Sequence, residues 1–298
     1  MTSFVDGPVV VSAPATSANL GPGFDSLGLA LGLRDRLTGE VRASGLEVEV
    51  AGEGADDVPL DEAHLVVRAM RAAFDEMGAQ PSGLRLRCDN AIPQARGLGS
   101  SSAAIVGGIA LARALVAGGT LLLDDDAAFR LAAHLEGHPD NVAPAWYGGL
   151  VISGREDEWF AVPAAVDPRV DVVVFVPPDP LSTEVARGLL PESVPHREAA
   201  ANAGRTALLV AALGSAPEHL LAATRDYLHQ DYRRPAMPVS LDLVDALRDD
   251  GVAAVVSGAG PTVLAFCAGC DAVALARRAP DGWVARRLEI DRDGVRVD

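Results

Sequence analysis

Lysine is absent from this chain of 298 residues, and all 25 of its basic residues are arginines. The familiar phosphate-binding loop ends in Gly-Lys-Ser/Thr, so a nucleotide site of that kind is excluded. An excess of positive charge is lacking as well, because the net charge is −16. Nucleic acids and acidic membrane surfaces require clustered cations, so we exclude both as partners. A small anionic ligand would have to be bound by individual arginines.

Long apolar segments are also lacking. No run approaches the roughly 18–20 residues that a membrane span requires, and the first residues, MTSFVDGPVVVSAPATSANLG, have neither a basic region nor a signal-like apolar block. We therefore expect a cytoplasmic protein. Cysteine is scarce: Cys88 stands alone, and Cys267 and Cys270 form FCAGC. A CxxC pair can be a redox or metal half-site, but without a second pair or a nearby histidine we expect two buried thiols with no function.

The remaining composition is that of a folded globular protein. Hydrophobic residues make up 49% and charged residues 22%, without an excess of Gly or Pro. Strands and helices are expected to alternate irregularly, which favours the α+β fold class. We expect strands at 9–14, 45–52, 83–90, 170–178 and 282–290, with two more within 252–267. We expect helices at 64–78, 101–117, 124–137, 184–190, 196–213, 216–228, 240–250 and 271–279. A boundary near residue 155 would give two domains, 1–155 and 156–298.

The stretch PQARGLGSSSAA, residues 93–104, places a glycine-broken turn rich in hydroxyl groups at the start of an apolar helix. Glycines let the backbone approach a phosphate, and the free N–H groups of the helix start point toward it. Serine hydroxyls can donate to phosphate or bind Mg²⁺. The alternative is a simple serine N-cap, which needs one serine and no preceding GLG. We favour the anion site.

Three further loops are rich in glycine, proline or polar residues. PATSANLGPGFDSLG (14–28) exceeds the roughly 2–5 residues of an ordinary turn; it is either a solvated loop or a ligand loop in which Asp25 holds an ammonium group and Asn19 a hydroxyl. In VVSGAGPTVLAF (255–266), glycines either make a tight bend or bring backbone against a ligand. In EGHPDNVAPA (136–145), Glu136 is a candidate Mg²⁺ ligand, Asp140 is a candidate N-cap, and His138 is either structural or catalytic.

Together these motifs resemble the GHMP kinases. Residues 93–104 are similar to the family's PxxxGLGSSxA signature, and SGAGPT is similar to its C-terminal motif. The stretches PATSANLGPGFDSLGLAL, EGHPDNVAPA, LSTEVAR (181–187) and YLHQDYR (227–233) resemble segments of the members that phosphorylate homoserine. The resemblance runs from Val10 to about Phe266 in the expected order.

The resemblance implies a GHMP kinase fold, with an N-terminal domain like ribosomal protein S5 domain 2 and a C-terminal ferredoxin-like domain. It implies ATP with Mg²⁺ as cofactors, L-homoserine as the phosphoryl acceptor, and a homodimer. The implied ATP-binding positions are Pro93, Gln94, Ala95, Arg96, Gly97, Leu98, Gly99, Ser100, Ser101, Ser102, Ala103, Gly258 and Gly260. Ser101 and Glu136 match the metal ligands.

The resemblance also assigns the acceptor end of the site. The matched substrate-binding positions are Asn19, Asp25, His138, Thr183, Arg187 and Arg233, and the implied catalytic residues are Asn141 and Arg187. Homoserine is a zwitterion, so guanidinium groups suit its carboxylate and Asp25 suits its ammonium group. Relatives such as mevalonate kinase have an aspartate where this chain has Asn141. Because an amide cannot take a proton, we expect Asn141 to orient the hydroxyl or the γ-phosphate.

Two positions depart from the family pattern. His64 stands where an asparagine often contacts adenine, so the base contact is expected from histidine or from backbone. Glu136 lies closer to His138 than in some relatives. Two alternatives also stay open: a kinase for another small alcohol, such as mevalonate or shikimate, and an inactive sensor that binds ligand without transferring phosphate.

Overall fold

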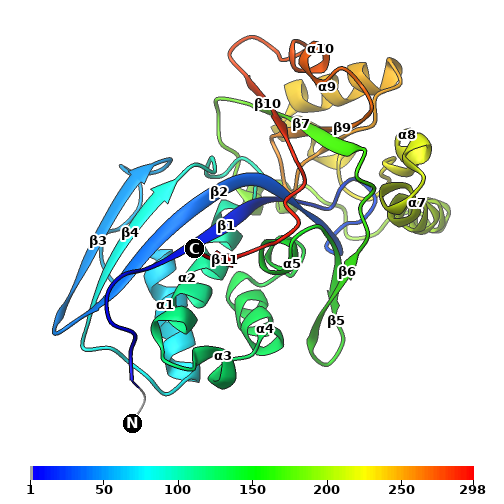
Figure 1. Ribbon diagram of the computed structural model, residues 1–298. Helices are drawn as coiled ribbons and strands as arrows, with labels where there is room; N and C mark the ends of the chain where they lie inside the picture. Colours follow the sequence, from blue (N-terminus) through cyan, green and yellow to red (C-terminus); the bar gives the residue numbers. More distant parts are fainter. Residues whose placement is uncertain (1–2) are drawn as a thin grey trace.

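The computed structural model describes residues 3–298, which form two β-sheets covered by helices (Figure 1). The first sheet has the strand order β11-β1-β2-β4-β3, with β5 paired to β2 and β6 to β5. Only β3 and β4 pair in parallel; the other neighbours are antiparallel. Its strands are β1 (Val9–Ala18), β2 (Leu27–Arg42), β3 (Gly45–Gly52), β4 (Gly83–Asn90), β5 (Leu150–Arg155), β6 (Trp159–Ala164) and β11 (Arg296–Val297).

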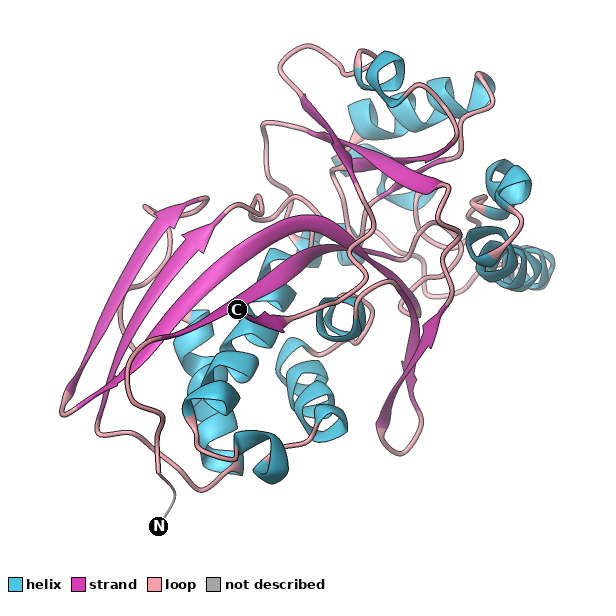
Figure 2. Cartoon of the chain, in the orientation of Figure 1, coloured by secondary structure: helices cyan, strands magenta, loops and turns pink. Residues whose placement is uncertain are grey.

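Helices cover one face of the first sheet, as Figure 2 shows. They are α1 (Leu65–Glu76), α2 (Ser100–Leu115), α3 (Gly119–Leu122), α4 (Asp125–Glu136) and α5 (Val142–Tyr147). α2 is apolar nearly all round, because it lies between α1, α4, α5 and the strands β1 and β2. Its buried residues join those of α1 and β4 in one hydrophobic core. The start of α2 is thereby held rigidly against the sheet.

The second sheet has the strand order β10-β7-β9-β8, all antiparallel. Helices connect β7 to β8 and β9 to β10, which is the ferredoxin-like arrangement expected from the family resemblance. The strands are β7 (Val170–Val176), β8 (Ala254–Val256), β9 (Val263–Ala268) and β10 (Val284–Leu288). The helices of this half are α6 (Thr183–Gly188), α7 (His196–Gly214), η1 (Pro217–His219), α8 (Leu220–Ala223), η2 (Asp231–Ala236), α9 (Pro238–Asp249) and α10 (Ala272–Ala276).

The expected helix at 216–228 is wrong in its second half. The helix ends at Ala223, and Asp226 then turns the chain because its carboxylate accepts the backbone N–H groups of residues 228, 229 and 230. An aspartate that bonds to nearby backbone offers the chain an alternative to the helix.

The hairpin of β5 and β6 was not expected from the sequence. Both strands belong to the first sheet, and residue 155 is the last residue of β5. We therefore propose to move the division between the two halves from residue 155 to the connection between β6 and β7.

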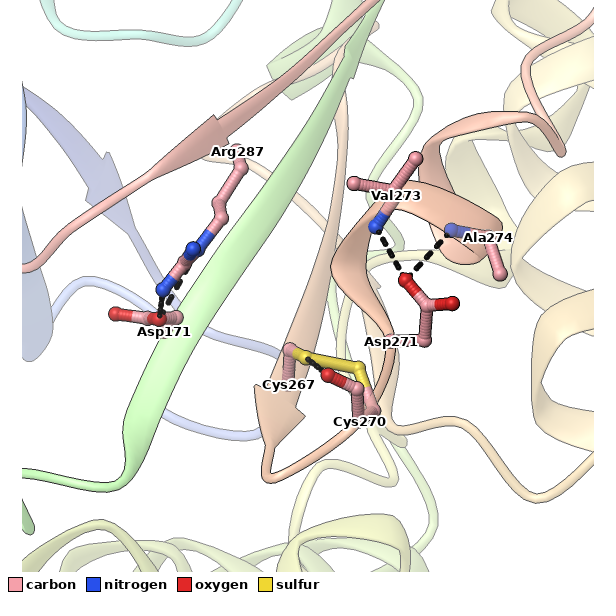
Figure 3. The surroundings of a disulfide bond; sticks show 7 residues. All are labelled: Asp171, Cys267, Cys270, Asp271, Val273, Ala274 and Arg287. Atoms are coloured by element: carbon pink, nitrogen blue, oxygen red, sulfur yellow. Dashed lines mark hydrogen bonds and ion pairs between the residues drawn. A yellow bond between two sulfur atoms is a disulfide. The ribbon is translucent and has the colours of Figure 1, made fainter.

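The expectation of two buried thiols in FCAGC is wrong. Cys267 and Cys270 form a disulfide where β9 turns toward α10 (Figure 3). Cys267 is buried and Cys270 is exposed, whereas Cys88 is a buried free thiol. Residues that are three apart can be bridged when the chain turns sharply between them, and periodicity alone does not reveal such a turn.

Within residues 3–298, no helix is both long enough and apolar enough to cross a membrane.

Candidate active site

Three loops that are far apart in the sequence meet where the two halves of the chain join. The backbone N–H of Thr16 donates to Leu98 O (3.0 Å), and that of Gly258 donates to Ala18 O (3.1 Å). Ser257 Oγ donates to Gly97 O (2.6 Å). A cavity of about 450 Å³ opens at this junction, so the loops expected to face one ligand do lie together.

The start of α2 has the geometry of an anion site. Its N-cap is Gly99 in the left-handed conformation, and no side chain caps the helix. The alternative of a serine N-cap is therefore wrong. The N–H groups of the first turn have no partners within the helix, and they carry the positive end of the helix dipole. This end of the cavity favours negative charge.

The glycines of this turn are required by close contacts. Gly97 has φ +74°, and a Cβ there would lie 2.2 Å from Ser257 O. Gly99 has φ +69°, and a Cβ there would lie 2.0 Å from Thr16 Oγ1. A side chain at either position would push the loops apart.

Glu136 reaches the same turn from the end of α4. Its Oε1 accepts hydrogen bonds from Ser101 Oγ (2.6 Å) and Ser102 Oγ (2.8 Å). Hydroxyl and carboxylate oxygens suit a hard cation. Residues 3–298 contain no cluster of three or more His, Cys, Asp or Glu side chains arranged for a metal. A cation held here would complete its shell with phosphate oxygens or water.

Asn141 and His138 also line the cavity. Asn141 Oδ1 accepts from Thr16 Oγ1 (2.8 Å), so its amide N–H groups remain to donate. His138 Nδ1 lies 2.8 Å from Asp140 Oδ1. Burial lowers the pKa of His138, but the hydrogen bond to Asp140 and the charges of Asp140 and Glu136 outweigh it, so the pKa is raised. Asp140 thus partners a histidine and is not the expected N-cap.

Two arginines, Arg187 and Arg233, line the cavity, and a carboxylate outside its lining pairs with one of them. Arg187 binds Asp25 through two hydrogen bonds, Nη2–Oδ1 at 2.7 Å and Nη1–Oδ2 at 3.1 Å. The pair raises the pKa of Arg187. The guanidinium carbons of Arg187 and Arg233 each lie 5.6 Å from the ring centre of Phe24. Both signs of charge therefore meet within a few ångströms.

Asn19 joins the loop of residues 14–28, here called the first loop, to the loop of residues 255–266. Its Oδ1 accepts from the backbone N–H of Asp25 (2.9 Å), and its Nδ2 donates to Gly258 O (2.9 Å). Asn19 and Asp25 both have positive φ, at 67° and 52°. Such strained backbone persists where surrounding contacts hold it. Asn19 therefore shapes the loop that carries Asp25.

Most residues expected at the site line the cavity. They are Asn19, His64, Pro93, Gln94, Ala95, Arg96, Gly97, Leu98, Gly99, Ser100, Ser101, Glu136, His138, Asn141, Thr183, Arg187, Arg233 and Gly258. Four others are not among its lining residues. Asp25 is paired with Arg187, Ser102 and Ala103 are buried in α2, and Gly260 packs beside Gly97.

Sequence reasoning gave no site role to Asp35, Thr16, Phe24 or His229, and it read Asp140 only as a cap. Asp35 and Asp140 line the cavity, and Thr16 holds Asn141. His229 bonds to Arg233. Within YLHQDYR, the spacing of four residues between His229 and Arg233 is the sequence feature that could have indicated their contact.

The chain matches known proteins along almost its whole length. The model of the GHMP kinases N terminal domain matches residues 64–149, and that of the GHMP kinases C terminal matches residues 205–283. A homoserine kinase of Streptomyces avermitilis is 54% identical over 99% of this chain and 97% of its own. One of Clavibacter michiganensis is 51% identical over 97% of this chain and 93% of its own.

A solved structure shares the fold. The crystal structure of homoserine kinase from Cytophaga hutchinsonii superposes with a TM-score of 0.86 at 24% identity, covering 100% of this chain and 99% of that one. The loops, the uncapped helix start and these matches together show that the chain belongs to the GHMP kinase family and groups with its homoserine kinases.

Proposed function

We propose that the protein transfers the γ-phosphate of ATP to the hydroxyl of L-homoserine, giving O-phospho-L-homoserine and ADP, a step of threonine biosynthesis. The observation that carries this proposal is one cavity lined both by the uncapped start of α2 and by Arg187 and Arg233, with Asp25 paired to Arg187. A triphosphate suits the helix start, and a small zwitterion with a hydroxyl suits the charged groups.

The base and phosphates of ATP have candidate partners in this cavity. The N–H groups at the start of α2 and the backbone of residues 97–99 would hold the phosphates. His64 is buried at the cavity wall, and its Nδ1 has no hydrogen-bond partner among the described residues. An unpartnered buried nitrogen is costly, so a contact with the adenine base would satisfy it.

Mg²⁺ fits the oxygen pair at the helix start. Ser101 and Glu136 would hold it, and the contact between their side chains supports this assignment. When bound, the ion neutralises charge on the phosphate oxygens.

The ion pair of Asp25 and Arg187 suits a zwitterion. An arriving homoserine would offer its ammonium group to Asp25 and its carboxylate to Arg187, so each charge lost in opening the pair is replaced. Arg233 would supply a second guanidinium group. An acceptor with only one charge would leave either Asp25 or Arg187 unpaired, which is costly in a partly buried site.

Asn141 would act as a hydrogen-bond donor. Thr16 occupies its carbonyl, so its amide N–H groups are free to orient the acceptor hydroxyl or a γ-phosphate oxygen. Phosphoryl transfer through a loose transition state depends mainly on positioning and charge neutralisation. The hydroxyl proton would then leave late, to phosphate or water.

The test is ADP release by the purified protein with Mg·ATP across several acceptors. We expect release with L-homoserine and little with mevalonate, shikimate or L-threonine. The single-charge analogues 3-amino-1-propanol and 4-hydroxybutyrate should be poor acceptors. Release with another alcohol would overturn the substrate assignment, and ATP binding without release to any acceptor would favour an inactive sensor.

The cellular location and the oligomeric state complete the proposal. We place the protein in the cytoplasm as a homodimer, as its family resemblance implies. Light scattering on the eluting protein tests the dimer: a mass near 30.8 kDa would contradict it.

A further inference from the structure

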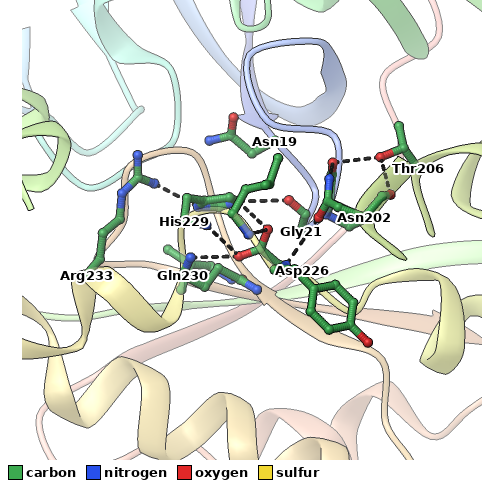
Figure 4. A network of polar contacts seen from close by, with 12 residues as sticks. Asn19, Gly21, Asn202, Thr206, Asp226, His229, Gln230 and Arg233 are labelled. Atoms are coloured by element: carbon green, nitrogen blue, oxygen red, sulfur yellow. Dashed lines mark hydrogen bonds and ion pairs between the residues drawn. The ribbon is translucent and has the colours of Figure 1, made fainter. Parts of the chain in front are cut away.

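A buried polar network lies behind Arg233, between the first loop and η2 (Figure 4). Arg233 is 1% exposed and His229 is 0% exposed. Arg233 Nη1 lies 3.0 Å from His229 Nδ1 and donates to Gly258 O at 3.2 Å, and its Nε donates to Ala186 O at 3.3 Å. Its Nη2 has no hydrogen-bond acceptor among residues 3–298, and Arg233 lines the cavity. Nη2 is therefore the part of this guanidinium group that is left for a ligand.

The partners of His229 fix its tautomer. Arginine can only donate, so His229 Nδ1 must accept and carries no proton. On the other side of the ring, Nε2 lies 2.8 Å from Gly21 O, a carbonyl that can only accept, so Nε2 carries the proton. A second proton would place two cations 3.0 Å apart in a buried site. The neutral ring is thus required by both neighbours.

The charged groups around His229 agree with a neutral ring. Burial and the charge of Arg233 lower its pKa, while the charges of Asp226 and Asp25 oppose this change. Asp226 Oδ1 lies 3.7 Å from His229 Nε2, but its carboxylate is already engaged by three backbone N–H groups. The aromatic ring of Phe24 stacks on the imidazole with centres 5.1 Å apart.

We propose that His229 is a positioning residue that aims Arg233 at the substrate carboxylate and ties it to the loop that carries Asp25. Nδ1 holds one N–H group of Arg233, and Nε2–H holds Gly21, four residues before Asp25. The part played by the carboxylate rests on the proposed function. The imidazole ring of His229 then sets the distance between Arg233, which binds the substrate carboxylate, and the loop whose Asp25 binds the ammonium group.

The first loop has a second anchor, which provides a control. Pro22 O accepts from Asn202 Nδ2 and from Thr206 Oγ1, each at 2.7 Å. Thr206 touches neither Arg233 nor His229 in this network. Thr206→Val therefore loosens the same loop without changing the aim of Arg233.

Two amide substitutions separate the functions of the ring. Asparagine reaches about as far as Nδ1, so His229→Asn can keep an acceptor for Arg233 while it loses the donor to Gly21. Glutamine reaches about as far as Nε2, so His229→Gln can keep that donor while it loses the acceptor. We expect His229→Gln to raise the KM for L-homoserine about tenfold or more, the scale of a lost bond to a charged group. His229→Asn should raise it less, and the KM for ATP should change less than about twofold in both.

A carboxylate-free competitor identifies the cause of the change. Inhibition by 3-amino-1-propanol should keep its wild-type Ki in His229→Gln, because this alcohol does not use Arg233. Thr206→Val should leave the KM for homoserine near wild type. Equal KM changes in the two His229 variants, or a parallel rise in that Ki, would overturn the proposal.

Nitrogen-15 NMR of the imidazole in the wild-type protein tests the geometry without any acceptor. We expect the resonance assigned through His229→Gln to report a proton on Nε2 only, unchanged from pH 6 to pH 8. A proton on Nδ1, or titration in that range, would overturn the proposal even if homoserine proved to be the wrong acceptor. A lack of activity toward homoserine with the expected tautomer would instead count against the proposed function alone.

Discussion

Asp35 is a buried carboxylate in the wall of the cavity that the proposed chemistry does not use. It is 5% exposed, and its Oδ1 accepts the backbone N–H groups of Ala91 (2.7 Å) and Ile92 (2.9 Å), just before residues 93–104, the proposed phosphate loop. Burial raises its pKa to about 6, against these two bonds, which lower it. The protonation of Asp35, and with it the hydrogen bonds that hold the start of the loop, therefore depends on pH.

The sign of that coupling is testable. The folded protein binds the Asp35 proton more tightly than the unfolded chain does, so the contribution to stability is full below about pH 4 and is lost as pH rises through about 6. Asp35→Asn should remove roughly 1 kcal/mol of the change in unfolding free energy between pH 5 and pH 8. Urea unfolding at both pH values measures it. An unchanged pH dependence in the variant would contradict the raised pKa.

Asn141 makes a second prediction at the residue scale. Asn141→Ala removes the amide donor but leaves the ion pair of Asp25 and Arg187 intact. We expect kcat to fall about 100-fold, as for other donors aimed at a developing charge, with little change in the KM for homoserine. Steady-state kinetics measure both constants. Turnover close to wild type would show that Asn141 does not orient the reacting groups.

Some of the loops and elements could be predicted from the sequence, whereas the contacts between them could not. The strands β3 and β4 agree with the sequence expectation because their apolar and charged residues alternate. The proposed phosphate loop could be predicted because glycines followed by several serines are typical of an anion site and are more than a simple N-cap needs. The pairing of Thr16 with Asn141 could not be found, because these residues are 125 apart and only the fold brings them together. The same holds for the contact between Asp25 and Arg187, both of which were expected at the substrate site.

The phosphate loop gives a prediction with a matched control. Gly97 and Gly118 have nearly equal φ, +74° and +75°, but a Cβ at Gly97 meets Ser257 O and Gly260 O, whereas nothing lies within 4 Å of one at Gly118. Both alanine variants carry the strain of positive φ, and only Gly97→Ala also disturbs the loop. We expect Gly97→Ala to weaken ATP binding at least tenfold beyond Gly118→Ala in calorimetry. Equal affinities would show that the close approach of the loops is dispensable.

Across the whole molecule, the end of the chain connects the two sheets. After β10, Glu289 O accepts from Gly32 N (2.8 Å) and Asp291 N donates to Ala30 O (3.1 Å), before β11 pairs with β1. Arg34 bonds to Asp291 and also donates to Ser12 O (2.8 Å) and Gly294 O (2.7 Å). The arrangement connects the second sheet to the first, and residues of both halves of the chain line the cavity. Periodicity could not reveal it, since these residues come from distant parts of the chain.

The Arg34–Asp291 pair should therefore matter for stability. Asp291 is 6% exposed, so Asp291→Asn leaves a guanidinium group without its charged partner, at a cost of about 3 kcal/mol in unfolding free energy. The exposed pair of Glu62 and Arg71 is the control, and Glu62→Gln should cost less than about 1 kcal/mol. Urea titrations compare the two. Equal losses of unfolding free energy in the two variants would contradict a particular contribution of the Arg34–Asp291 pair to stability.

The central claim is that one cavity brings ATP and homoserine together for phosphoryl transfer. Phosphorus-31 NMR of the wild-type protein with Mg·ATP and L-homoserine tests it most directly. We predict a new phosphomonoester signal, split by the neighbouring CH₂ protons and growing in step with ADP. Orthophosphate alone, or ATP that stays intact while it binds, would contradict the account.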